Sequence, residues 1–293
     1  MGRIGRSWAL TKSCFRILRR EKYLAWFPVL SGLSGMLVLA PLIAGAIALA
    51  VHGVSSLDQG WFDRHRTELK VGGAAALFLL YFVGYFLSTF FNVGLISCVL
   101  SRLEGKPTSF GRGMKTAWSR LGKIAGWAFL GATVGVVLQA IESRVGFLGQ
   151  LAVRFVGLAW SLVTFLVAPV IAFEGLGPVD AVKRSAALFK QTWGEQLAFR
   201  FGIGTALSML FLLFTLVVVG VGIAVPALTG MAAGGTALGL WVIGLFLFVF
   251  ASGVALAIVS SCLTSIYHAV LYSYAVTGML ADEFDAGLLP QRA

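Results

Sequence analysis

Residues 177–202 read GPVDAVKRSAALFKQTWGEQLAFRFG and lie between two long apolar runs. The apolar side chains of this stretch recur at spacings of four, three, four and four, as on one face of a helix: Val182, Ala186, Phe189, Trp193 and Leu197. Pro178 suits the first turn of a helix, and Asp180 suits the positive end of its dipole. The segment is too polar to cross a bilayer, so we expect an amphipathic helix at the membrane surface.

The composition of the whole chain is that of a membrane protein. Hydrophobic residues make up 58% of the 293 residues and charged residues only 12%, whereas soluble domains carry about 25% charged residues. A net charge of +11 would indicate nucleic acid binding in a soluble protein, but these cations adjoin apolar runs. We therefore expect membrane lipids as partners, in particular anionic ones, and no nucleic acid.

Six apolar runs are long enough to cross a bilayer, which takes about 20 residues. They cover residues 24–51, 71–100, 121–141, 151–173, 201–228 and 237–264. The alternative for the first run is a signal peptide with ALA at residues 48–50 as its cleavage site. The run is longer than the apolar part of a signal peptide, which has about 7–15 residues, so an uncleaved span is favoured.

The basic residues predict how these spans are oriented. The tails and the loops after the second and fourth spans hold 18 of the Lys and Arg residues, and the opposite side holds 5. Because Lys and Arg accumulate on the cytoplasmic side, both termini are predicted to be cytoplasmic. The predicted localisation is the cytoplasmic (inner) membrane.

Similar amphipathic segments precede the other span pairs. PTSFGRGMKTAWSRLGK lies before the third span, with Thr108 or Ser109 as its cap, and RIGRSWALTKSCFRILRREK lies before the first. The latter places Phe15 and Leu18 on its apolar face. Two local identities support a repeat: LEGKP (103–107) with FEGLGP (173–178), and RSWALTK (6–12) with RSAALFK (184–190).

The predicted fold is therefore all-α. It is a six-transmembrane helical bundle in one integral membrane domain, residues 1–293, built from three units that each consist of an amphipathic helix and a two-span hairpin. The approximate units are residues 1–100, 101–173 and 174–280, followed by an acidic tail at 281–293.

An E-G-x-x-P turn followed by a basic helix resembles a pattern in uncharacterised bacterial and archaeal polytopic membrane proteins. These include the membrane domain fused to some glycerophosphodiester phosphodiesterases. The matching residues are Glu174, Gly175, Pro178, Ala181, Arg184, Ser185, Leu188, Lys190 and Trp193. The resemblance implies a helical six-span protein, and this chain has no phosphodiesterase domain.

Two groups of residues are candidates for function. The first would meet the lipid interface with cations and tryptophans: Arg6, Trp8, Lys12, Arg16, Arg19, Arg20, Arg112, Lys115, Trp118, Lys183, Arg184, Lys190 and Trp193. The second is polar and lies within or just beyond the spans, either lining a path or packing between helices: Asn92, Ser261, Ser265, His268 and Tyr272. In the last helix, hydrogen bonding to the cytoplasmic helices is favoured over a vestibule.

These patterns favour a non-enzymatic membrane protein. No nucleophile, carboxylate pair or metal cluster is visible in the sequence, so we expect no catalytic site, no metal and no cofactor. A transporter or channel with a path between the hairpins is the alternative, and a cavity reaching Asn92 or His268 would favour it. Protein partners are not specified, and a homo-oligomer is possible.

Overall fold

The computed structural model describes residues 3–48, 66–199, 205–229 and 235–278, and all regular structure in these ranges is helical. The elements in chain order are α1 (Arg3–Arg20), η1 (Lys22–Ala25), α2 (Trp26–Ala48), α4 (Arg66–Leu103), α5 (Phe110–Ser119), α6 (Leu121–Glu142), α7 (Phe147–Val163), α8 (Val167–Phe173), α9 (Pro178–Phe199), α10 (Thr205–Thr229) and α11 (Gly235–Thr277). The amphipathic segments predicted before each span pair are the helices α1, α5 and α9.

Within the described ranges, five segments are long and apolar enough to cross a membrane: Lys22–Pro41, Val71–Leu103, Leu121–Glu142, Phe147–Phe173 and Leu238–Thr277. The fifth predicted span, 201–228, corresponds to α10, whose apolar stretch Phe211–Pro226 is shorter. Residues 201–204, at the start of this predicted span, lie outside the described ranges. The chain therefore has the helices of a membrane protein, and a sixth span is not established by length.

Two helices are much longer than a bilayer requires. α4 has 38 residues and α11 has 43, so at 1.5 Å per residue they extend about 57 and 65 Å. The hydrocarbon core of a bilayer is only about 30 Å thick. A large part of each helix therefore lies beyond any membrane that it crosses.

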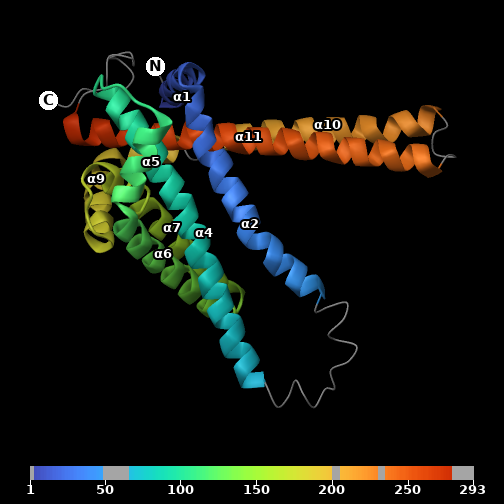
Figure 1. The fold of residues 1–293 in the computed structure, drawn as a ribbon, viewed down its shortest axis with the longest axis horizontal. Helices are drawn as coiled ribbons and strands as arrows, with labels where there is room; N and C mark the ends of the chain where they lie inside the picture. Colours follow the sequence, from blue (N-terminus) through green and yellow to red (C-terminus); the bar gives the residue numbers. More distant parts are fainter. Residues whose placement is uncertain (1–2, 49–65, 200–204, 230–234, 279–293) are drawn as a thin grey trace.

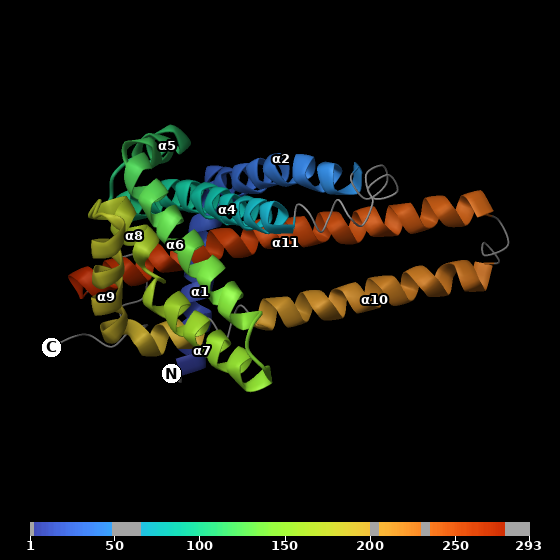
Figure 2. The ribbon, with the colours of Figure 1, turned by 90° about the horizontal axis from the view of Figure 1, so that it is seen from below.

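The buried side chains gather at one end of the molecule, which we call the helical core. It consists of the C-terminal halves of α4 and α11 together with α1, η1, the starts of α2 and α6, α5, α8 and α9. Figures 1 and 2 show α1, α5, α9 and the C-terminal end of α11 gathered at this end of the molecule. Beyond it the spans diverge and expose large apolar side chains such as Leu37 and Leu240, which are 78% and 73% exposed. Such faces suit contact with lipid rather than water.

The amphipathic helices pack their apolar faces into this core. α9 buries Ala181, Ser185 and Leu188. α5 buries Ala117 and is capped by Ser109, whose hydroxyl accepts from the Arg112 N–H. Ser109 is thus the cap, one of the two predicted.

Phe15 and Leu18, on the predicted apolar face of α1, line one groove, but a neighbouring face of the helix is the one buried in the core. α1 buries Cys14 and Ile17, whereas Phe15 is 50% exposed. The reason is that α1 has two apolar neighbourhoods: it packs on α9 and α11, and Phe15 lines a groove beside α11. Periodicity alone does not tell which of the two a side chain meets.

Candidate functional site

The E-G-x-x-P turn between α8 and α9 is the centre of a polar cluster. Glu174 Oε1 accepts a hydrogen bond from Arg184 Nε at 2.9 Å and another from the Tyr272 hydroxyl at 2.8 Å. The Glu174 side chain is only 22% exposed, and a partly buried carboxylate is stabilised by such donors. This one side chain ties together α8, α9 and α11.

Gly175 in this turn has a φ of +63°, which glycine adopts without strain. Its carbonyl oxygen accepts a hydrogen bond from Lys123 Nζ, and a side chain in its place would meet the guanidinium of Arg120. Pro178 packs against Gly126, where an added Cβ would lie 3.1 Å from the proline ring. The turn is therefore fixed against the start of α6.

The fourth predicted span is interrupted. α7 ends at Val163 and α8 begins at Val167, so the span predicted over 151–173 lies within the apolar segment Phe147–Phe173 but consists of two helices. Pro169 explains the break, because proline has no N–H to donate to the carbonyl four residues earlier, at Phe165. Ser185 of α9 supplies the missing partners: its hydroxyl accepts from the Leu166 N–H at 3.1 Å and donates to the Val163 oxygen at 2.5 Å.

These contacts give the matching motif a structural explanation. Glu174, Gly175, Pro178 and Ser185 fasten α9 to the helices around it. Lys190, by contrast, is exposed. The motif thus marks where an amphipathic helix joins the helical core.

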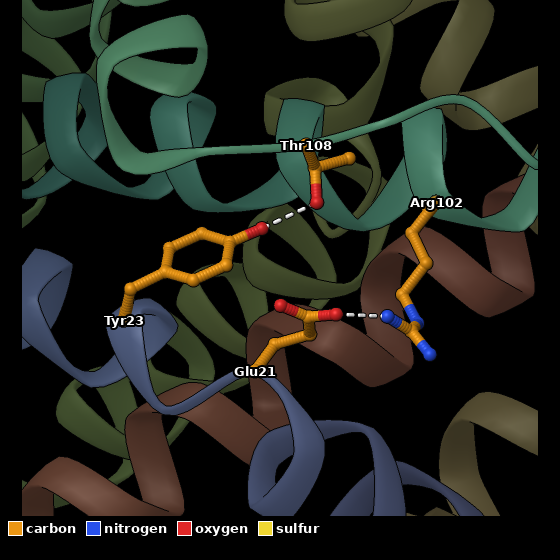
Figure 3. Close-up of polar contacts among 4 residues, drawn as sticks. All are labelled: Glu21, Tyr23, Arg102 and Thr108. Atoms are coloured by element: carbon orange, nitrogen blue, oxygen red, sulfur yellow. Dashed lines mark hydrogen bonds and ion pairs between the residues drawn. The ribbon is translucent and has the colours of Figure 1, made fainter.

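The junction of α1 and α2 is tied down by different residues (Figure 3). The Glu21 carboxylate accepts from Arg102 Nη1 at the end of α4, and the two side chains are 24% and 21% exposed. The Tyr23 hydroxyl lies 2.5 Å from the Thr108 hydroxyl, before α5. Sequence reasoning missed these residues because their partners are more than 80 positions away.

Most of the predicted lipid-interface side chains are exposed. These are Lys12, Arg16, Arg19, Arg20, Arg112, Lys115, Trp118, Lys183 and Lys190. Arg184 differs, because it is half-buried and paired with Glu174. The side chains of Arg6, Trp8 and Trp193 lie outside the part of the chain that the structure describes.

The polar stripe predicted along α11 is divided among three environments. The Tyr272 hydroxyl donates to Glu174 in the α8–α9 turn. Ser265 is buried and donates to the Ser261 carbonyl of its own helix, while Ser261 is exposed. The His268 ring packs on Phe165 with 3.9 Å between ring centroids.

His268 also lines a partly open cavity of about 410 Å³ together with Asn92. α4, α6, α7, α8 and α11 all contribute to its wall. Thr164 and Thr264 line it, and each donates its hydroxyl proton to the carbonyl four residues earlier. Asn92 Oδ1 is buried without a hydrogen-bond partner. The cavity therefore offers acceptor atoms, and its lining residues carry no acidic or permanently cationic group.

Comparison with known proteins places this arrangement in a family. Residues 71–282, which run from α4 through α11, match the family of unknown function DUF6159. The chain belongs to this family. The DUF6159 match includes the α8–α9 turn, Ser185 and the cavity, but not α1, Glu21 or Tyr23. No curated protein matches the chain, and no solved structure matches it either.

Proposed function

We propose that the chain is a non-enzymatic multi-pass protein of the cytoplasmic membrane. Its helices α1, α5 and α9 join the cytoplasmic ends of the spans and present cations to anionic lipid. The proposed topology has six spans, with α10 as the fifth, and places the helical core inside the cell. The excess of Lys and Arg near the core end of the spans supports this orientation.

The observation that carries the proposal is the division of faces on the amphipathic helices. α5 buries Ala117 while Arg112, Lys115 and Trp118 are exposed, and α9 buries Leu188 while exposing Lys190. Each cation near an anionic surface contributes about 1 kcal/mol. Trp118 is 62% exposed and packs edge-on against Phe90 of α4, as suits a tryptophan at a membrane interface.

The resemblance to membrane domains fused to some glycerophosphodiester phosphodiesterases supports a helical six-span protein. The proposal specifies no protein partner, and it allows a second copy of the chain as one.

Quenching of tryptophan fluorescence tests the lipid preference. The full-length protein is reconstituted in mixed vesicles that contain brominated phosphatidylglycerol or brominated phosphatidylcholine at equal fractions. We expect stronger quenching by the anionic lipid, and a smaller difference in a variant with Arg112→Gln, Lys115→Gln and Lys183→Gln. Equal quenching by both lipids in the unaltered protein would refute the proposal.

A transport path is the second candidate, and the cavity that contains Asn92 and His268 favours it. Such paths are lined by interrupted helices near the substrate, and the α7–α8 break borders this cavity. Asn92→Cys and His268→Cys variants test it with a membrane-impermeant thiol reagent. Labelling of both positions supports a water-filled path, whereas protection of both in the folded protein excludes one.

A further inference from the structure

A groove between the first span and the last helix carries positive charge at one end only. Two adjoining cavities of about 420 and 440 Å³ share Ile258 of α11. The first is walled by apolar side chains such as Leu18 and Val259, with Arg19 and Lys22 among its lining residues. The second continues along α2 and α11 and is mostly apolar. Together they form what we call the α2–α11 groove.

The α2–α11 groove matches one lipid leaflet in length. From Trp26, at the start of α2, to Met36, which lines the second cavity, the helix rises about 15 Å. This is half of the roughly 30 Å hydrocarbon thickness of a bilayer. Gly32 also lines the groove, and a Cβ added to it would meet no atom within 4 Å. An acyl chain therefore has both the length and the space to lie there.

The carboxylate next to Lys22 in the sequence pairs elsewhere and not with the charge at the end of the groove. Glu21 and Tyr23, on either side of Lys22 in the sequence, point toward Arg102 and Thr108 (Figure 3). Lys22, which lies between these two residues in the sequence, lines the groove instead. The Glu21 carboxylate is thus engaged by α4, and none of the groove's lining residues is acidic.

We propose that the α2–α11 groove binds one anionic phospholipid. Its phosphate pairs with Arg19 and Lys22, and one acyl chain lies along α2 and α11. Guanidinium and ammonium groups both bind phosphate oxygens. This site rests on the lipid preference proposed above, and adds that one molecule is held at a defined position.

Native mass spectrometry of the full-length protein in detergent, titrated with phosphatidylglycerol, tests the headgroup contact. In the double variant Arg19→Gln and Lys22→Gln we expect the affinity of the first bound lipid to fall on the order of 30-fold, since each cation near the anion contributes about fivefold. The control is Arg144→Gln with Arg154→Gln, two exposed cations outside the proposed lipid interface, which removes the same charge and should leave the first site unchanged. Equal losses in both double variants would leave a general lipid preference but overturn the site.

A second pair of variants tests the acyl chain. Gly32→Phe fills the groove, whereas Gly35→Phe adds the same ring to α2 where the glycine also has open space and does not line the groove. We expect Gly32→Phe alone to weaken the binding of phosphatidylglycerol at least tenfold. Glycerol phosphate, which has the headgroup without the chains, should not bind. Binding of glycerol phosphate as tight as that of the lipid, or equal binding by the two phenylalanine variants, would overturn the groove as the acyl site.

Discussion

Replacing Ser185 by alanine tests how the helical core holds the interrupted span. The Ser185 hydroxyl is fully buried and serves both the Leu166 N–H and the Val163 carbonyl. Each buried backbone group left unpaired costs about 1–3 kcal/mol. The substitution should therefore lower the free energy of unfolding by at least about 2 kcal/mol.

The assay is thermal unfolding of the detergent-solubilised protein, in which size-exclusion chromatography measures the folded fraction after heating. For a chain of 293 residues, about 2 kcal/mol corresponds to a loss of about 3 °C in Tm. Ser143→Ala is the matched control, because that hydroxyl is exposed and donates only to a carbonyl of its own helix, so its effect should stay within about 0.5 kcal/mol. If Ser185→Ala unfolds within 1 °C of Ser143→Ala, the role assigned to this hydroxyl is refuted.

Three further predictions concern the core. Gly113→Ala should lower the free energy of unfolding by about 1–3 kcal/mol, because the added Cβ would lie 2.6 Å from a backbone oxygen of α4. A Cβ at Gly111 in the same helix meets no atom within 4 Å, so Gly111→Ala should be neutral or stabilising in thermal unfolding. Arg102→Gln should lower the free energy of unfolding by about 1–2 kcal/mol, because the half-buried carboxylate of Glu21 is left without its partner. Lys106→Gln, which removes an exposed ion pair, should lower it by less than about 0.5 kcal/mol. Burial raises the pKa of the Cys14 thiol from 9.0 to about 12, so maleimide should label this thiol only when the protein unfolds. The stability that the thiol contributes below pH 9 should be lost as pH rises toward 12. Rapid labelling of Cys14 in the folded protein at pH 8 would contradict this prediction.

Local patterns in the sequence predicted most of the elements. Spacing alone located α5 and α9, Ser109 was one of two proposed caps, and the E-G-x-x-P segment proved to be a turn with Gly175 at positive φ. These features depend on residues within a few positions of each other, so the sequence displays them directly.

Features that depend on distant partners were not predictable in the same way. Pro169 was a visible signal for the α7–α8 break, but it lay inside an apolar run that reads as one span. Arg102, the partner of Glu21, comes from α4, and Tyr272, a partner of Glu174, comes from α11. No local spacing identifies either pair. Five helices converge to form the cavity at Asn92 and His268. The sequence alone does not show that these two residues meet there, and so it does not determine their roles.

The topology of the chain is the most direct test of the whole account, because the lipid contacts require the helical core to be cytoplasmic. Single-cysteine variants at Ser56, Ser143 and Ala232 lie in the three loops predicted outside, and Lys106→Cys lies in a loop predicted inside. With a membrane-impermeant thiol reagent, the account predicts that the first three are labelled in intact cells and that Lys106→Cys is labelled only after permeabilisation. Labelling of Lys106→Cys in intact cells, or of the Ala232 variant only after permeabilisation, would contradict the six-span topology and its cytoplasmic core.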